Sequence, residues 1–227
     1  MQKNKKILSD YLVDLQKVDS IEKLDRLITK ITNSTDSIYN NFRCKSGCFT
    51  CCKGANIPPV YAKEWQRMRE QIKKLPEDTR NQIKENLKYL LKKYELLLNS
   101  ANDSLLENSS QSQLADITKH LKNEYSEEAC PLHINGVCSV YEVRSSKCRG
   151  FGYFSVKSDN EVKLLTCEAL ACDIHKFFSL NKTKQIIFPY WNAFENKLSD
   201  LSKDVHEKYE KAIIPFWLKS DFESGEL

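Results

Sequence analysis

Cysteine is the residue type most able to do chemistry in this 227-residue chain, because its nine copies are strongly clustered. Between residues 44 and 52 the chain carries Cys44, Cys48, Cys51 and Cys52. Between residues 130 and 172 it carries Cys130, Cys138, Cys148, Cys167 and Cys172. Clustered thiols in a reducing compartment indicate metal binding or redox chemistry rather than a disulfide scaffold.

The spacing of the first cluster suits metal ligation. If residues 44–52 are helical, each position turns by about 100°, and the four thiols project within one arc of about 100°. If they form a loop, Cys48 and Cys51 have the two-residue separation of a metal knuckle. The adjacent thiols of Cys51 and Cys52 fit two metal ions, or one ion and a neighbouring cluster atom, better than a single tetrahedral ion.

The second cluster contains a turn signal, Asn135-Gly136, which folds the chain back so that Cys130 and Cys138 approach each other. Four thiolates suit zinc, or iron in an iron–sulfur cluster, and eight suit two zinc ions or a cluster with additional thiols. An isolated cysteine is more often a small buried hydrophobic residue, but this density of thiols favours ligation. We expect the two clusters to meet as one metal centre or two adjacent centres.

Three segments carry a resemblance to a known family. They are Cys44 to Cys52 followed by Lys53-Gly54, the stretch CPLHINGVCSVYEVRSSKCRGF from Cys130 to Phe151, and Ala171-Cys172-Asp173. In these blocks the chain resembles the YkgJ-type (CxxCxxCC) cysteine-cluster family, whose domain is described as zinc- or iron-chelating. One departure is Ser145, which follows Arg144 where the family usually has proline.

The resemblance implies a set of eight metal ligands and leaves Cys167 as a surplus thiol. The implied ligands are Cys44, Cys48, Cys51, Cys52, Cys130, Cys138, Cys148 and Cys172. It implies metal binding without naming a reaction. Because some relatives look like flagellin lysine N-methylases, the alternative is an iron–sulfur-dependent enzyme, either a protein lysine methyltransferase or an oxidoreductase.

The first cluster also has the three-cysteine spacing of radical S-adenosylmethionine enzymes. Those enzymes normally carry an aromatic residue just before the third cysteine, where this chain has Thr50, and Phe49 stands one place early. The chain also lacks the repeated strand–helix pattern of a barrel. A metal-binding module is therefore our first interpretation, and whether the chain is an enzyme stays open.

Several other residues near the cysteines are candidates for the site. Arg144 and Arg149 flank Cys148, so we expect their guanidinium groups to offset thiolate charge and donate hydrogen bonds to sulfur. Tyr141 is expected to pack under the site and to donate with its hydroxyl group. For His133 and His175 ligation is the minor alternative, and loop or surface positions are favoured.

Composition excludes several classes of function. A net charge of +4 without a dense Lys/Arg run argues against nucleic-acid binding, and no segment approaches the roughly 18 apolar residues of a membrane span. Asp10 and Asp14 interrupt the first apolar stretch, so we expect no secretory signal and a cytoplasmic location. The phosphate-binding patterns GxGxxG and GK[ST] are absent. A metal ion is the predicted partner, and no protein partner is indicated.

Hydrophobic spacing predicts a mainly α fold, with helices around a cysteine-rich metal centre and one short β-hairpin. We expect a single domain, 1–227, with ligand segments 44–52 and 130–172 and a helical insertion over about 59–125. Helices are predicted over about 20–42, 59–75, 77–98 and 191–213, a polar loop over 99–112, and the hairpin over 151–156 and 162–165. Asp19 and Glu22 could form a capping box. The aromatic residues expected in the core are Tyr190, Trp191, Phe194, Phe216 and Trp217.

Overall fold

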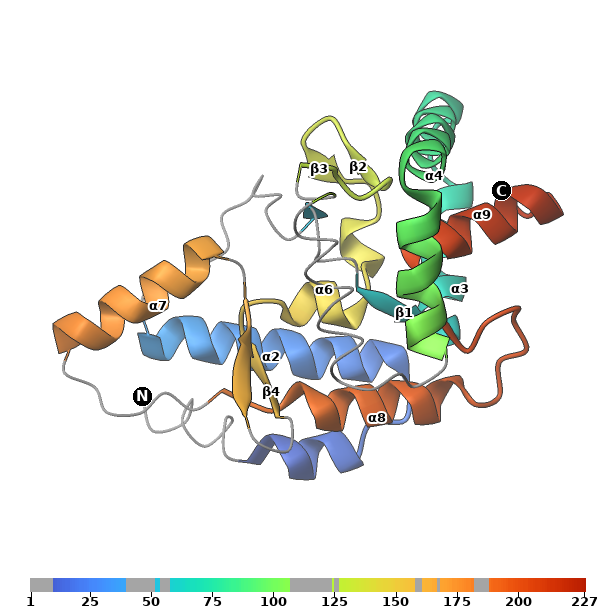
Figure 1. Cartoon of the computed structure of the whole chain (residues 1–227). Coiled ribbons are helices and arrows are strands. Elements are labelled where there is room, and N and C mark those ends of the chain that lie inside the picture. Colours follow the sequence, from blue (N-terminus) through green and yellow to red (C-terminus); the bar gives the residue numbers. More distant parts are fainter. Residues whose placement is uncertain are drawn as a thin grey trace. The chain divides into compact units, whose positions relative to one another are not determined.

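The structure is a computed structural model that describes residues 10–39, 52–53, 58–106, 124, 127–157, 161–166, 168–181 and 188–227. The chain divides into two compact units. The first unit comprises Met1–Ser46 and Ser146–Lys203, and the second comprises Gly47–Ser145 and Asp204–Leu227. Helices dominate both units and are accompanied by short two-stranded sheets (Figure 1). The prediction of a mainly α fold is therefore confirmed, while the single-domain organisation stays a prediction.

The first unit is built on helix α2 (Ile21–Tyr39). Its capping residue was predicted to be Asp19, but Ser20 caps the helix instead, because the Ser20 Oγ atom accepts a 3.3 Å hydrogen bond from the Lys23 amide. Asp19 pairs with the Lys23 ammonium group. The buried face of the helix carries Leu24, Ile28 and Ile31 at helical spacing.

In the rest of the first unit, aromatic residues pack β4 (Phe154–Lys157) against α8 (Trp191–Ser202). This part of the unit also contains α6 (Ser146–Gly150), β5 (Val162–Leu165) and α7 (Glu168–Asn181). Strands β4 and β5 pair antiparallel, so the predicted hairpin is confirmed, although its first strand begins at Phe154 rather than at residue 151. The Phe154 ring packs edge-on against Trp191 and Phe194, at centroid distances of 5.3 and 5.0 Å.

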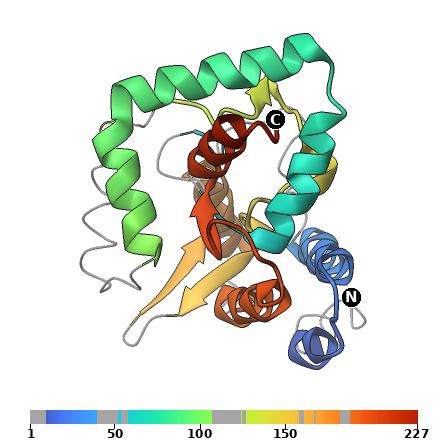
Figure 2. The same cartoon turned by 90° about the vertical axis from the view of Figure 1, so that its right-hand side faces the viewer.

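The second unit surrounds a two-stranded sheet made of β1 (Pro59–Tyr61) and β6 (Lys211–Ile213). Helices α3 (Ala62–Lys73), α4 (Glu77–Leu106) and α9 (Ile214–Ser224) enclose it. Figure 2 shows α9 between α3 and α4. The remaining elements of this unit are β2 (His133–Ile134), β3 (Val137–Cys138) and the 3-10 turn η2 (Tyr141–Val143).

The core of the second unit is anchored by two stacked tryptophans, Trp65 and Trp217, whose ring centroids are 5.7 Å apart. Each indole N–H has a buried acceptor, the Asp221 carboxylate for Trp65 and the Val60 carbonyl for Trp217. Of the aromatic residues predicted for the core, Trp191, Phe194, Phe216 and Trp217 are buried, whereas Tyr190 is exposed. That prediction is thus confirmed except at Tyr190.

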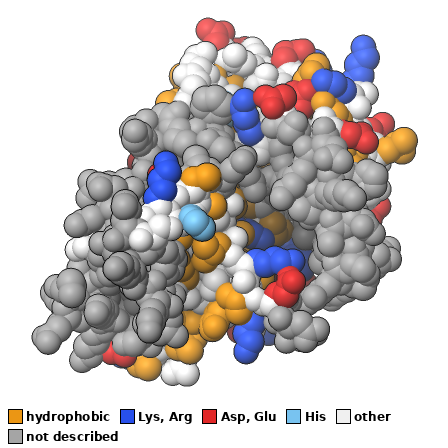
Figure 3. Space-filling model, turned by 60° about the vertical axis from the view of Figure 1, so that its left-hand side comes forward, with side chains coloured by type: hydrophobic (Ala, Val, Ile, Leu, Met, Phe, Trp, Pro, Cys, Tyr) orange, Lys and Arg blue, Asp and Glu red, His pale blue; other side chains and the backbone are white. Residues whose placement is uncertain are grey.

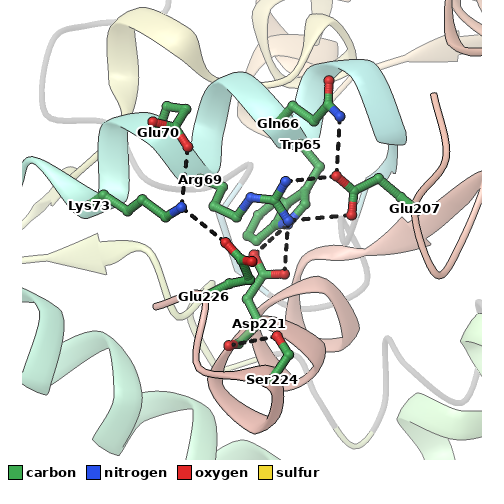
Figure 4. A network of polar contacts seen from close by, with 9 residues as sticks. All are labelled: Trp65, Gln66, Arg69, Glu70, Lys73, Glu207, Asp221, Ser224 and Glu226. Atoms are coloured by element: carbon green, nitrogen blue, oxygen red, sulfur yellow. Dashed lines mark hydrogen bonds and ion pairs between the residues drawn. The ribbon is translucent and has the colours of Figure 1, made fainter. Parts of the chain in front are cut away.

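A polar network joins α3, the segment before β6, and α9 (Figure 4). The Arg69 guanidinium group donates to both carboxylate oxygens of Glu207, the shorter bond being 2.7 Å, and to Asp221 at 3.3 Å. Burial raises the pKa of Asp221 above its usual 3.8, against the opposing effects of Trp65 and Arg69. Lys73, on the same helix as Arg69, forms ion pairs with Glu70 and Glu226.

Three predicted helix boundaries were wrong. The helix predicted to begin at residue 59 begins at Ala62, because residues 59–61 form strand β1 and pair with β6. The helix predicted to end at residue 98 continues to Leu106, because Leu98 and Ala101 face the core and buried Asn102 accepts a hydrogen bond from the Ile213 amide. The helix predicted over 191–213 ends at Ser202. Residues 211–213 instead pair with β1, and this tertiary contact overrides the local helical pattern.

None of the helices that the structure describes is long and apolar enough to cross a membrane. Figure 3 shows one face of the molecule, on which the described Lys and Arg side chains are interspersed with Asp and Glu side chains. Within the described part of this face, they form no continuous basic surface.

Candidate metal centre

The described part of the chain includes five of the eight cysteines predicted as ligands. Cys52, Cys130, Cys138 and Cys148 are half-buried, and Cys172 is exposed. The predicted ligands Cys44, Cys48 and Cys51, and the surplus thiol Cys167, lie outside the described residues.

Cys52 and Cys130, one from each cysteine cluster, meet in the backbone of the second unit. The Cys130 amide donates a 2.7 Å hydrogen bond to the Cys52 carbonyl oxygen. The neighbouring residues Lys53 and Ala129 form an antiparallel bridge. The last cysteine of the first cluster and the first cysteine of the second cluster therefore lie on adjacent, hydrogen-bonded segments.

A tight hairpin positions Cys138 near the start of the second cluster. Asn135 and Gly136 both have positive φ angles, 51° and 82°, as a two-residue type I′ turn requires. Cys138 is thereby placed opposite His133 in the β2–β3 register, and the His133 amide donates a 2.8 Å bond to the Cys130 carbonyl. The predicted turn is confirmed, and the direct cross-strand neighbour of Cys138 is His133 rather than Cys130.

The segment that enters Cys130 is attached to α4 by a group of polar side chains. One oxygen of Glu128, Oε1, accepts hydrogen bonds from Lys93 at 2.8 Å, Tyr94 at 2.9 Å and Tyr89 at 3.1 Å. The hydrogen bond to Glu128 is the main cause of a raised pKa for Lys93. Burial opposes ionisation of Glu128, but the three donors hold its pKa below the usual value. Glu128 is consequently a carboxylate at neutral pH.

In the sequence, Glu127 and Glu128 belong to a polar stretch that shows no arrangement for acid–base catalysis. The apolar spacing of residues 77–98 places Tyr94 on the apolar face of its helix. The only local signal was the four-residue separation of Tyr89 and Lys93, which places them on one helix face. Their common partner Glu128 lies on another segment, and one sequence gives no indication of that contact.

Cys148 lies in α6 of the first unit, and its neighbour Arg149 turns toward α2. The Arg149 Nε atom is 3.3 Å from the Asp25 carboxylate, with the two side chains only 14% and 9% exposed. Ser146 donates a 3.0 Å hydrogen bond to the same carboxylate oxygen. The observed contact of Arg149 joins α6 to α2, and its predicted place against thiolates stays a prediction.

Arg144 and Tyr141 form a pair at the surface of the second unit. The guanidinium carbon of Arg144 lies 3.7 Å from the centre of the Tyr141 ring, and its Nη1 atom donates to the Tyr141 carbonyl at 2.7 Å. The Tyr141 side chain is 57% exposed. Its ring is covered by an arginine side chain rather than by the core, and its place beside a metal site stays a prediction.

Cys172 and His175 lie three residues apart on α7 and are both exposed. Among the residues that the structure describes, no three His, Cys, Asp or Glu side chains are close enough to hold a metal ion. The metal centre thus stays a prediction. The structure shows that the segments carrying Cys52 and Cys130 are paired through their backbones.

Comparison with protein-family models, with curated proteins and with solved structures finds no match to this chain. The resemblance to the YkgJ-type family accordingly rests on the cysteine motifs alone and stays a prediction.

Proposed function

We propose that the chain binds zinc or iron through cysteine thiolates drawn from the eight predicted ligands. The observation that carries this proposal is the 2.7 Å hydrogen bond between the Cys130 amide and the Cys52 carbonyl, which joins the last cysteine of the first cluster to the first cysteine of the second. Thiolate clusters of this density are the ligands that zinc and iron–sulfur centres use. The family resemblance supports the same function.

The donor set of the second unit fits such a metal. Five predicted ligands belong to this unit, namely Cys48, Cys51, Cys52, Cys130 and Cys138. A bound metal would supply a cross-link between segments that are distant in sequence, and its binding free energy would stabilise the fold. The Asn135-Gly136 turn and the Cys52–Cys130 hydrogen bond hold the backbone of these segments together. The proposal also requires a reducing compartment such as the cytoplasm, because oxidised thiols do not ligate.

Serine variants test this proposal, with the surplus thiol as a matched control. We expect Cys52→Ser and Cys130→Ser each to lower the metal bound per chain, because a serine hydroxyl is a much poorer ligand than a thiolate. Cys167→Ser also removes one thiol and should leave the bound metal unchanged. Equal metal content in all three variants and the wild-type chain would contradict the proposal.

A further inference from the structure

Glu128 stands two residues before Cys130 and is attached to α4 by a single carboxylate oxygen. That oxygen accepts hydrogen bonds from the Tyr89 and Tyr94 hydroxyl groups and from the Lys93 ammonium group. The ammonium group also lies over both tyrosine rings, 5.4 and 4.9 Å from their centres. The Glu128 side chain is only 18% exposed, so these contacts are shielded in part from water.

The shape of α4 is unusual at this point. On a regular helix, residues five apart project about 140° from each other, so Tyr89 and Tyr94 would not share a partner easily. In α4 the backbone leaves helical geometry at Tyr94, with φ −131° and ψ 21°. Both hydroxyl groups nevertheless reach the same oxygen of Glu128. The kink and the attachment of Glu128 thus occur at the same place in the chain.

The same helix also holds the chain on the other side of Cys130. The Asn86 side-chain amide donates a 3.4 Å hydrogen bond to the Pro131 carbonyl. Leu132 and Ile134 then enter the buried core that includes Leu87 and Leu90 of α4. Cys130 is therefore bracketed by two attachments to one helix, while its own amide is bonded to Cys52.

We propose that Glu128 is a positioning residue, whose attachment to Tyr89, Lys93 and Tyr94 holds Cys130 beside Cys52 for metal binding. This inference rests on the proposed function. Two segments that are held in place before the metal arrives lose less conformational entropy when it binds. Releasing Glu128 should therefore weaken metal affinity while leaving the number of ligands unchanged.

The test measures the affinity for Zn²⁺ by competition with a chromophoric chelator, under reducing conditions, in the full-length chain. Glu128→Ala removes the acceptor, and the double variant Tyr89→Phe/Tyr94→Phe removes two donors while keeping both rings. The matched control is Glu127→Ala, because Glu127 is adjacent and 85% exposed, with a 3.3 Å ion pair to Lys53. Thermal unfolding of each metal-free protein reports whether it is folded, and the Co²⁺–thiolate absorption band reports the ligand set.

We expect about tenfold weaker Zn²⁺ binding in both Glu128→Ala and the double variant, the size typical of residues that support metal ligands. The Glu127→Ala variant should match the wild type, and metal per chain at saturation should be unchanged throughout. If Glu128→Ala does not fold, the double variant decides, since it preserves packing. Wild-type affinity in the folded variants would overturn the positioning role, whereas a wild-type chain that binds no Zn²⁺, Co²⁺ or iron would overturn the proposed function itself.

Discussion

The amide of Cys130 donates a 2.7 Å hydrogen bond to the carbonyl oxygen of Cys52. This bond joins the end of the first cysteine cluster to the beginning of the second. It is extended by the antiparallel bridge between Lys53 and Ala129. The segments that carry Cys52 and Cys130 are thus paired through their backbones, with one cysteine on each.

The turn between β2 and β3 should matter for metal binding as well as for stability. Gly136 has φ +82°, and a Cβ atom there would meet no atom within 4 Å. Gly136→Ala therefore introduces backbone strain without a clash, which costs about 1–2 kcal/mol. We expect this loss in denaturant unfolding, together with weaker Zn²⁺ binding, because Cys138 lies only two residues after Gly136.

Gly225→Ala is the matched control for this prediction. Gly225 has φ +78°, an equally open surrounding, and a position at the end of α9, away from the cysteine segments in sequence. It should lose similar stability but keep the wild-type affinity for Zn²⁺. Equal weakening of metal binding in both variants would argue against a specific role of the hairpin.

The buried carboxylate of Asp221 predicts a particular dependence of stability on pH. Its folded-state pKa is raised by burial, so the folded chain binds this proton more tightly than the unfolded chain. Wild-type stability therefore loses this contribution as pH rises from the usual value of 3.8 through the higher folded-state pKa. We expect the free energy of unfolding of Asp221→Asn, relative to wild type, to rise over that range in the metal-free protein.

Glu226→Gln should show the opposite sign. The hydrogen bond from Lys73 lowers the folded-state pKa of Glu226, so its stabilising contribution is present above the usual value of 4.5 and is lost as pH falls. The stability of this variant relative to wild type should therefore fall as pH rises. Urea unfolding at several pH values measures the stability of both variants relative to wild type. If the two relative stabilities change in the same direction with pH, the opposite pKa shifts of Asp221 and Glu226 are contradicted.

The ion pair between Arg149 and Asp25 predicts a stabilising role that is separate from metal binding. Both side chains are largely buried in the first unit, so removing one partner leaves a buried charge poorly compensated. We expect Arg149→Met and Asp25→Asn each to destabilise the chain. A double-mutant cycle should give a coupling of about 1–3 kcal/mol, measured by urea unfolding.

Metal affinity distinguishes this role from the one predicted by sequence. If Arg149 acted mainly as a donor to thiolates, Arg149→Met would weaken Zn²⁺ binding and Asp25→Asn would not. The observed contact predicts that the two variants behave alike in both stability and affinity. A coupling near zero would show that the pair contributes nothing to the fold.

Features with local causes were predictable from sequence. The Asn135-Gly136 turn was recognised because both residues tolerate positive φ, and β4–β5 was recognised from alternating residues around a polar turn. The cap predicted at Asp19 was one residue early, because Asp19 and Ser20 are both good capping residues and only the structure shows which one is used.

Features with long-range causes were not predictable. Helix α8 ends at Ser202 because the following segment contributes Glu207 to Arg69 and β6 to β1. The apolar spacing of Val205, Tyr209 and Ala212 gave no sign of those partners. Two contacts of the candidate site were not predictable for the same reason. Glu128 is positioned by residues of α4, and Arg149 by Asp25 of α2. Each contact joins segments whose proximity depends on the fold.

Elemental analysis with an absorption spectrum, on wild-type protein purified without oxygen, tests the central claim most directly. We expect the protein to contain either zinc, at about two ions per chain and without a visible band, or iron with sulfide and a broad band near roughly 400 nm. The second result would favour the iron–sulfur enzyme alternative over a closed structural centre. Protein that is folded and reduced, yet carries neither zinc nor iron and takes up neither on reconstitution, would contradict the account.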